Sequence, residues 1–415
     1  MRLGLGGNLW GNRDFVRLWA SDTVSEFGNQ FTQFALPVLA VLAFRATPLQ
    51  MGALGSLGFV AFPTLGLFVG VWADRFRKRR IMIVCNVGRL AILGSIPLGF
   101  VAGVLSMYQL YLVALLNGVF AVFFDVAYQA YLPLLVERGD LLEGNQKLQS
   151  SASAAQVVGP TLAGFLYQLI GGAFTVAVDA VGYTLSAISL ASIRKVEPIV
   201  DQGRRRSFFV EMKEGIDIVV RNPILKRIAA CTATTNLGNT MVATVITIFA
   251  LNYLKFTPVE LGVVGTIGAV GFLVGVLSSG RITRRLGLGV TLALAIGIGF
   301  VAMLEPLALR GYPFVVLSAI AFVLSFEVPL YNINQVSLRQ AMTPQPLQGR
   351  MNATMRTIVW GTIPVGSVIG GTLGQILGVV NTIYIGGAIS GLASLWILLG
   401  PVIRLKTQPP PVAEG

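Results

Sequence analysis

Two acidic residues, Asp22 and Glu26, stand one helical turn apart in the first apolar stretch of the sequence. The spacing i, i+4 places both carboxyl groups on one face of a helix. Counted from Phe15 at about 1.5 Å per residue, Glu26 lies roughly 16 Å along that helix, near the middle of a bilayer. Burial and a neighbouring like charge both favour the protonated form of a carboxylate. The pair therefore has the chemistry of a group that takes up and releases protons.

Other ionisable residues also fall inside apolar stretches, where each charge costs about 3 kcal/mol and needs a reason. The acidic ones are Asp125, Asp179 and Glu327, and the basic ones are Arg89 and Arg356. We expect Asp125 and Glu327 to take part in proton coupling or to face the substrate. We expect Asp179 and Arg89 to be structural charges that neutralise each other between outer helices.

The sequence contains no histidine and two cysteines, Cys85 and Cys231. Without histidine there is no Ser-His-Asp triad and no zinc-peptidase motif. The cysteines lie far apart in apolar stretches and are interpreted as small packing residues. No phosphate-binding loop of the form G-x-x-x-x-G-K-[ST] occurs, so any energy should come from an ion gradient. We therefore expect no cofactor, no metal and no enzymatic activity.

The elements that carry these residues are predicted to be membrane-spanning helices. Hydrophobic residues make up 54% of the 415 residues, only 12% are charged, and the mean hydropathy is +0.74. A chain this apolar needs lipid as its solvent, and a spanning helix needs about 20 apolar residues. The composition therefore predicts an all-α membrane protein. Twelve such runs are expected, near residues 15–44, 48–73, 81–105, 108–136, 144–170, 172–193, 223–253, 257–280, 286–309, 312–341, 350–378 and 380–403.

The net charge of +13 is explained by the placement of the basic residues. If the N-terminus is inside the cell, all of the 31 Lys and Arg except Arg45, Lys255 and Arg310 fall on the cytoplasmic side. This agrees with the positive-inside rule and puts both termini of a multi-pass inner-membrane protein in the cytoplasm. The basic runs are then topology signals that touch membrane lipid, and nucleic-acid binding is not expected.

An internal repeat organises the twelve runs. A shift of 210 residues places Asn12 on Asn222, Arg17 on Arg227, Gly28-Asn29 on Gly238-Asn239 and Thr47-Pro48 on Thr257-Pro258. A shift of 207 places Asn145 on Asn352, Gly159 on Gly366, Gly164 on Gly371 and Gly171 on Gly378. We predict two parallel six-helix halves, 1–197 and 222–405. A cytoplasmic linker with an amphipathic helix (198–221) joins them, and a disordered tail (406–415) follows.

The loop after the second run carries a family resemblance. Residues 70–80 read G-V-W-A-D-R-F-R-K-R-R and resemble the signature G-x-L-A-D-R-x-G-R-K of the major facilitator superfamily. In that family the loop is a conformational latch, whose acid caps helix 11 and holds the outward-facing state. The resemblance assigns this role to Gly70, Asp74, Arg75, Lys78 and Arg79, with Gly280 and Arg285 in the second copy. Arg77 stands where the family has glycine, and Arg284 replaces the acid of the second copy, which implies an asymmetric latch.

The fifth run contains Gly159, Pro160 and Gly164, which resemble the core of the G-P-x-x-x-G motif of exporters and antiporters. Three further phrases, at residues 12–19, 178–180 and 211–223, resemble the macrolide-efflux and siderophore-exporter branch of drug:proton antiporters. This branch mostly performs efflux. The resemblance therefore implies export.

In such a fold helices 1, 4, 7 and 10 line a central cavity, and four of the five acids fall on them. Phe34 and Phe124 are expected in its apolar wall, and Asn236, the repeat mate of Glu26, and Asn239 among its polar contacts. Acids and aromatics with few basic residues suit hydrophobic neutral or cationic compounds. We expect a monomeric, proton-coupled exporter of amphipathic or hydrophobic small organic molecules that works by alternating access. A siderophore exporter, a small-metabolite uptake carrier and a lipid translocator are the alternatives.

Overall fold

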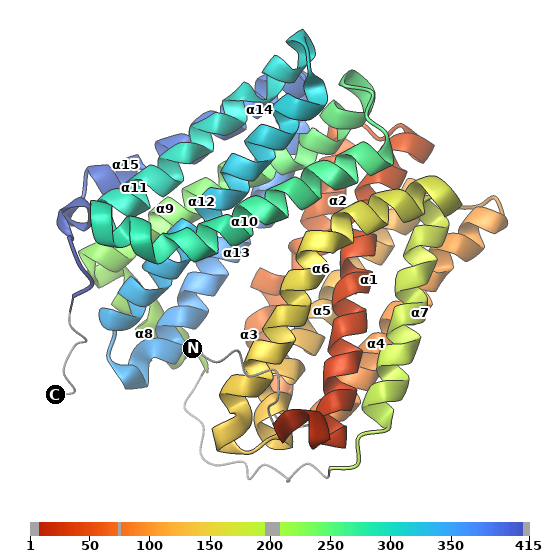
Figure 1. The fold of residues 1–415 in the computed structure, drawn as a ribbon, viewed down its shortest axis with the longest axis horizontal. Coiled ribbons are helices and arrows are strands. Elements are labelled where there is room, and N and C mark those ends of the chain that lie inside the picture. Colours follow the sequence, from red (N-terminus) through yellow and green to blue (C-terminus); the bar gives the residue numbers. More distant parts are fainter. Residues whose placement is uncertain (1–7, 74–75, 196–207, 410–415) are drawn as a thin grey trace. The chain divides into compact units, whose positions relative to one another are not determined.

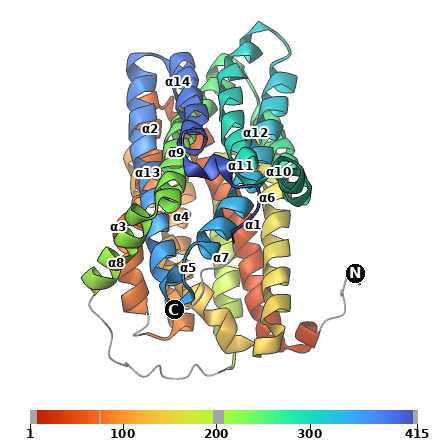
Figure 2. The same ribbon diagram turned by 90° about the vertical axis from the view of Figure 1, so that its left-hand side faces the viewer.

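The computed structural model describes residues 8–73, 76–195 and 208–409, and its regular elements in these ranges are helices (Figures 1 and 2). The first part of the chain forms α1 (Arg13–Phe44), α2 (Pro48–Phe59), α3 (Ala61–Ala73), α4 (Lys78–Val101), α5 (Met107–Leu135), α6 (Leu141–Ile170) and α7 (Gly172–Ala191), with the 3₁₀ turns η1 (Asn8–Gly11) and η2 (Arg138–Asp140). The second part forms α8 (Phe208–Arg221), α9 (Pro223–Ile248), the π-helical turn η3 (Phe249–Tyr253), α10 (Pro258–Leu286), α11 (Leu288–Gly297), the 3₁₀ segment η4 (Ile298–Arg310), α12 (Pro313–Ala341), α13 (Gln345–Ile376), α14 (Val379–Leu392), α15 (Leu395–Leu398) and the 3₁₀ turn η5 (Pro401–Arg404).

Eleven candidate membrane spans are found among the described residues. They coincide with the predicted runs except for 144–170, which corresponds to α6. Helix α6 has 30 residues and is long enough to span, but its first half is polar. The predicted run 48–73 consists of two helices, because Pro63 cannot donate to the carbonyl of Phe59, where α2 ends.

Helix starts at repeat-related positions use the same caps. Asn12 before α1 and Asn222 before α9 each accept hydrogen bonds from two backbone N–H groups of the following turn. Thr47 before α2 and Thr257 before α10 each accept one from the third residue of the helix. In both cases the side chain of that third residue accepts a hydrogen bond from the backbone N–H of the cap residue, which completes a capping box.

Backbone conformation repeats as well. Arg45 and Lys255, which are 210 residues apart, both adopt the left-handed region, with φ of 51° and 59°. Gly171 and Gly378, which are 207 residues apart, have φ of 82° and 87° just before α7 and α14. Most residues avoid this region, so the agreement is not accidental. The two shifts found in the sequence therefore relate positions of equivalent local structure.

The chain forms two compact units whose limits differ from the sequence halves at two segments. Unit 1 comprises Met1–Arg45, Thr64–Gln202 and Thr257–Thr266, and unit 2 comprises Ala46–Pro63, Gly203–Phe256 and Ile267–Gly415. The segment 46–63 thus groups with the second half of the sequence, and 257–266 groups with the first.

Glycine allows each of these segments to pack closely. A Cβ atom on Gly52 of α2 would lie 2.5 Å from the carbonyl oxygen of Ser367 in α13. A Cβ atom on Gly262 of α10 would lie 2.4 Å from the carbonyl oxygen of Pro160 in α6. Gly52 and Gly262 are related by the shift of 210, and Pro160 and Ser367 by that of 207. The two contacts are therefore copies of one another.

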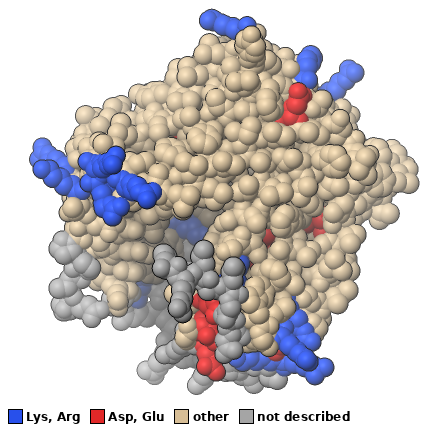
Figure 3. Space-filling view, in the orientation of Figure 1, with Lys and Arg blue, Asp and Glu red and all other residues tan. Residues whose placement is uncertain are grey.

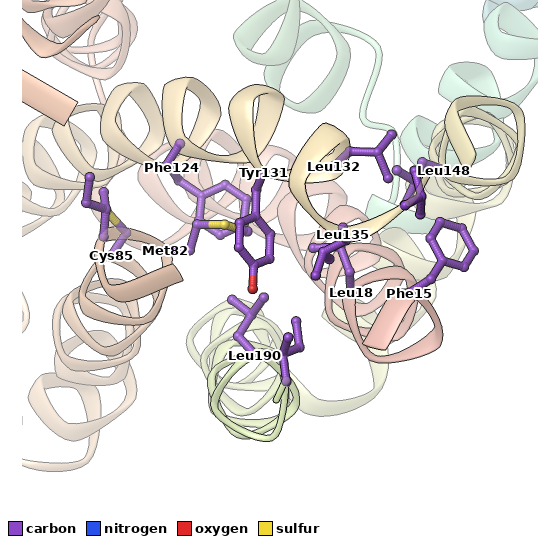
Figure 4. Close-up of a cluster of buried hydrophobic side chains, with 14 of the residues drawn as sticks. Phe15, Leu18, Met82, Cys85, Phe124, Tyr131, Leu132, Leu135, Leu148 and Leu190 are labelled. Carbon is purple, nitrogen blue, oxygen red and sulfur yellow. The ribbon is translucent and has the colours of Figure 1, made fainter. Parts of the chain in front are cut away.

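The core of unit 1 is an apolar cluster on α1, α4, α5, α6 and α7 (Figure 4). Its labelled members are Phe15, Leu18, Met82, Cys85, Phe124, Tyr131, Leu132, Leu135, Leu148 and Leu190. Cys231 is buried in a similar cluster of unit 2. Both cysteines are free and packed among apolar side chains, as predicted.

The predicted linker helix is α8, and it packs on the first turns of α13. Arg350 donates a hydrogen bond to the carboxylate of Glu214, and Gly215 lies so close to α13 that a Cβ atom would be 2.8 Å from the Arg350 carbonyl oxygen. Ile216 and Val220 are exposed on another face of α8. Residues 198–207 of the predicted linker and 410–415 of the predicted tail lie outside the described residues.

On the face shown in Figure 3, Lys and Arg gather in separate groups, and wide areas between them carry no charge. Large apolar side chains are exposed on many helices, for example Leu98 and Leu277. A protein in water rarely exposes so much apolar surface, whereas lipid tails accept it. The surface therefore agrees with the membrane spans.

Candidate proton-coupling and substrate site

Asp22 lies on α1 and is only 6% exposed. The hydroxyl of Tyr128 in α5 donates a hydrogen bond to its carboxylate. The Tyr128 ring stacks on Phe124, one turn away on the same helix, with 6.0 Å between ring centroids. The contact thus joins α1 to α5 through a buried acid and an oriented phenol.

Glu26 lies one turn further along α1 and is partly buried. Its carboxylate interacts electrostatically with Asp22, with Asp125 of α5 and with Arg89 of α4. Asp125 is also partly buried, and it accepts a hydrogen bond of 3.1 Å from the side chain of Gln129. The structure therefore brings three of the acids expected from the sequence into one group in unit 1.

Such a group is suited to bind protons. Carboxylates that are close together repel one another when all are ionised, and the weak screening away from water strengthens the repulsion. Protonating one of them relieves the repulsion, because one negative charge is removed. The acid group of unit 1, Asp22, Glu26 and Asp125, can thus hold a proton and release it when water or a cation approaches.

Arg89 is buried next to this acid group, with 3% exposure. Its Nη1 donates a hydrogen bond of 3.1 Å to the hydroxyl of Tyr183 in α7, which donates in turn to Asn29 of α1 at 2.6 Å. The guanidinium also lies over two aromatic rings, 5.4 Å from the centroid of Phe124 and 5.1 Å from that of Tyr183. Cation–π contacts of this kind stabilise a buried charge.

Asp179 of α7 is almost fully buried, with 1% exposure. One carboxylate oxygen accepts a hydrogen bond from Thr32 of α1. The other is so close to α1 that a Cβ atom added to Gly28 would lie only 2.0 Å from it. Arg89 acts on Asp179 electrostatically. Within the described residues, however, no ion-pair contact of 4.0 Å or less joins the two, so the direct neutralisation expected from the sequence is not made here.

The charges of this network are not repeated in the second half of the sequence. The shift of 207 takes Asp179 to Gly386 and Tyr183 to Ser390, and the shift of 210 takes Glu26 to Asn236. The hydrogen bond survives, since Ser390 donates to Asn239 at 2.7 Å as Tyr183 does to Asn29. Asn236 donates to the carbonyl of Val359 at 3.2 Å. The titratable groups at these positions are thus confined to unit 1.

Among its described residues, unit 2 has two buried acids of its own. Glu327 of α12 is 3% exposed and Glu305 of η4 is 6% exposed, and in each the Oε2 atom has no hydrogen-bond partner in the part of the chain that the structure describes. The sequence reasoning missed Glu305. The signal was present, because Glu305 is a single acid within the apolar run 286–309.

The two aromatic residues expected in the cavity wall, Phe34 and Phe124, differ in how deeply they are buried. Phe124 is buried in the apolar core of unit 1, and Arg89 lies over its ring. Phe34 is partly buried. A cavity of about 290 Å³ lies between α4 and α5, lined mainly by Phe76, Val84, Cys85, Phe120 and Phe123, with Arg80 also at its lining.

Part of the predicted latch can be described. Asp74 and Arg75 lie outside the described residues, and Gly70 lies in α3. Lys78 is buried at the start of α4. Arg79 donates from Nε to the carbonyl oxygen of Leu190 at 2.9 Å and also bonds the next carbonyl, so it satisfies the last turn of α7.

In the second copy of the latch, Gly280 has open space around it and Arg285 is exposed at the end of α10. The glycine–proline motif of the fifth predicted run lies in α6 and packs tightly. A Cβ atom on Gly159 would lie 2.6 Å from that of Gln30, and one on Gly164 would lie 2.4 Å from the carbonyl oxygen of Pro258. The motif therefore brings α6 against α1 and against the start of α10.

Comparison with protein families gives one model, described as Major Facilitator Superfamily, which matches residues 18–361. Macrolide efflux protein A of Streptococcus pyogenes is 25% identical over 384 residues, which cover 90% of this chain and 93% of that protein. The enterobactin exporter EntS of Citrobacter koseri is 25% identical over 401 residues, with 92% and 90% coverage. The multidrug efflux pump Tap of Mycolicibacterium fortuitum is 25% identical over 373 residues, with 86% and 88% coverage.

Solved structures share the fold at low identity. A bacterial homologue of the iron transporter ferroportin, in an inward-facing state, has a TM-score of 0.76 and 17% identity, and the match covers 93% of this chain and 98% of that one. The nucleoside transporter NupG has a TM-score of 0.75 and 12% identity, with 93% and 98% coverage. These relatives and neighbours are membrane transporters and not enzymes.

Proposed function

Because this chain belongs to the Major Facilitator Superfamily, a family of membrane transporters, we propose that it is a secondary active transporter that exports amphipathic or hydrophobic small organic molecules in exchange for protons. The observation that carries the proposal is the acid group of unit 1. Asp22, Glu26 and Asp125 lie together inside membrane-spanning helices, where ionised carboxylates are costly. The cost of placing three acids there is explained if their protons take part in the transport cycle.

The cycle follows from the chemistry of these acids. While water is excluded, the group keeps a proton, because the ionised form is poorly solvated. A substrate that carries a cationic group and enters beside the carboxylates favours their ionised form, and the proton leaves. Proton and substrate thus compete for the same charge, which is the requirement for exchange. Alternating access then exposes the site to each side of the membrane in turn.

The architecture is proposed from the repeat and the family. We assign twelve spanning helices in two parallel six-helix halves, with α6 as the span of low hydropathy. The positive-inside distribution favours the cytoplasmic membrane with both termini inside. One chain carries both halves, so a monomer is sufficient. In the absence of an ATP-binding loop in the sequence, the proton gradient is the proposed energy source.

Export is favoured over uptake by the relatives, three of which are named as efflux proteins or exporters. The enterobactin exporter relative, aligned over 92% of this chain, supports siderophore export as a second candidate function. The two candidates differ in substrate and share the same coupling group.

The test uses everted membrane vesicles with an imposed proton gradient. Fluorescent cationic dyes, a macrolide and enterobactin are offered in turn to wild type, Glu26→Gln and Asp125→Asn. The matched control is Glu137→Gln, an exposed acid in the loop before η2. We expect gradient-dependent accumulation in wild type and the control, and a loss of at least about tenfold in Glu26→Gln.

The other outcomes are equally informative. Accumulation of enterobactin alone selects the siderophore candidate. Transport that does not respond to the proton gradient contradicts proton coupling. If none of these compounds accumulates, a small metabolite and a labelled phospholipid are offered to the same vesicles. Exchange of the metabolite without accumulation, or movement of the phospholipid alone, replaces the exporter with an uptake carrier or a lipid translocator.

A further inference from the structure

Arg89 is held in an incompletely satisfied position. The guanidinium is buried between the rings of Phe124 and Tyr183, and its Nη1 donates to the Tyr183 hydroxyl. Its Nε has no hydrogen-bond partner in the described part of the chain. A guanidinium offers five N–H donors, and leaving a buried one unpaired is unfavourable. Arg89 therefore has a donor that is available for a second arrangement.

Two carboxylates act on this one cation from different helices. Glu26 lies on α1 and Asp179 on α7, and the charge of Arg89 acts on both. The Oδ1 atom of Asp179 lacks a hydrogen-bond partner within the described residues, as the Nε of Arg89 does. An unpaired donor and an unpaired acceptor thus occur in the same buried network. One guanidinium cannot fully compensate two acids at the same time.

The charged and titratable surroundings of Arg89 come from four packed helices. They are Asp22 and Glu26 on α1, Cys85 on α4, Asp125 and Tyr128 on α5, and Asp179 and Tyr183 on α7. Among the described residues, Arg89 is the basic side chain that acts on Glu26, Cys85, Asp179 and Tyr183 of this set. The balance of charge in the network therefore depends on where its guanidinium points.

We propose that Arg89 is a positioning residue that forms an ion pair with Glu26 and with Asp179 in turn, in step with proton binding at Glu26. The inference rests on the proposed proton coupling. When Glu26 is ionised, the guanidinium compensates it. When Glu26 takes a proton, the guanidinium turns to Asp179, and its free Nε donates to Oδ1.

The exchange has a mechanical consequence. Asp179 lies against the backbone of α1 at Gly28 and accepts from Thr32 of the same helix. Arg89 belongs to α4, and Tyr183 ties it through Asn29 to α1. A change of partner by Arg89 therefore alters the contacts among α1, α4 and α7. Proton binding at one carboxylate is in this way passed to the packing of three spanning helices.

The test measures the protonation of Glu26 directly. A hydrophobic carbodiimide reacts with protonated carboxyl groups, and its adduct on Glu26 is quantified by mass spectrometry in purified protein over a range of pH. Asp179→Asn is the reference background, because neutralising Asp179 removes the cost of an uncompensated acid when Arg89 is changed. The variants compared within it are R89Q/D179N and R89K/D179N.

We expect Asp179→Asn to move the midpoint of labelling to lower pH than in wild type. Arg89 then pairs with Glu26 alone, and its positive charge favours the ionised, unreactive form of Glu26. We expect R89Q/D179N to label at least about one pH unit above Asp179→Asn, since Glu26 loses its cation. R89K/D179N, which keeps the charge, should stay near Asp179→Asn. Equal midpoints in Asp179→Asn and R89Q/D179N overturn the inference and leave Arg89 a structural charge.

Transport separates this inference from the proposed function. If Glu26→Gln abolishes proton-driven transport while R89Q/D179N keeps the pH profile of Asp179→Asn, the inference is overturned and the coupling site remains. If Glu26→Gln transports like wild type and Glu26 labelling shows no pH dependence, both are overturned together.

Discussion

At the scale of the residue, the hydrogen bond from Tyr128 gives the buried carboxylate of Asp22 a polar partner on α5. Tyr128→Phe removes the donor and keeps the ring that stacks on Phe124. Hydrogen bonds to charged groups contribute about 1.5–3 kcal/mol, so we expect proton-driven efflux to fall by about tenfold or more. The rate of dye efflux in everted vesicles checks this.

The matched control is Tyr108→Phe, which changes an exposed tyrosine on the same helix. It should transport like wild type. If Tyr128→Phe also retains the full rate, the Asp22–Tyr128 contact has no part in the cycle.

A second residue-scale prediction concerns Gly28. A Cβ atom there would lie 2.0 Å from the Asp179 carboxylate, so Gly28→Ala must displace a buried charged group. We expect a loss of stability of about 1–3 kcal/mol, read as a lower melting temperature in detergent. Asp179→Gly, the residue at the repeat-related position 386, should relieve the clash in the double variant.

Gly94→Ala is the control for Gly28→Ala, because the space around Gly94 in α4 is open. It should leave the melting temperature unchanged or raise it. A Gly28→Ala protein as stable as this control would mean that Asp179 is not fixed against α1.

At the scale of the element, the close packing of α2 on α13 and of α10 on α6 depends on glycine. Gly52→Ala places a methyl group 2.5 Å from a backbone carbonyl oxygen, and Gly262→Ala does so at 2.4 Å. Backbone atoms cannot turn aside as a side chain can, so both variants should melt several degrees below wild type. Gly58→Ala, on the open side of α2, is the control. Equal melting of Gly52→Ala and Gly58→Ala would contradict the packing.

Most helices could be predicted from the apolar runs, because a spanning helix has a strong and simple signal. The break between α2 and α3 was missed, although Pro63 marks it. α6 falls below the hydropathy of the other spans because its first half is polar. The caps at Asn12 and Asn222 show that even helix starts could be read from the repeat.

The site was only partly predictable, because partners across helices are set by packing. Asp22, Glu26 and Asp125 were found as acids in apolar runs, and the structure groups them. The Tyr128 partner of Asp22 has no sequence signal of its own. The direct pairing of Asp179 with Arg89 was expected from charge alone, but Tyr183 and Thr32 hold the two groups instead.

At the scale of the whole molecule, the proposed topology makes a prediction about accessibility. In a chain whose two cysteines are replaced by alanine, single cysteines at Arg45, Lys255 and Arg310 should react with a membrane-impermeant maleimide in intact cells. A cysteine at the exposed position Arg221 should react only in everted vesicles. Labelling with the opposite sidedness would invert the proposed orientation.

The central claim is that substrate and proton exchange through the acid group of unit 1. Its most direct test is proton release from the purified transporter in proteoliposomes, recorded with a pH indicator when a transported dye is added without any gradient. Wild type should release protons as dye binds and moves, and Glu26→Gln should bind dye and release at least about tenfold fewer. Dye transport by wild type with no proton movement would contradict the claim, as would unchanged proton release from Glu26→Gln.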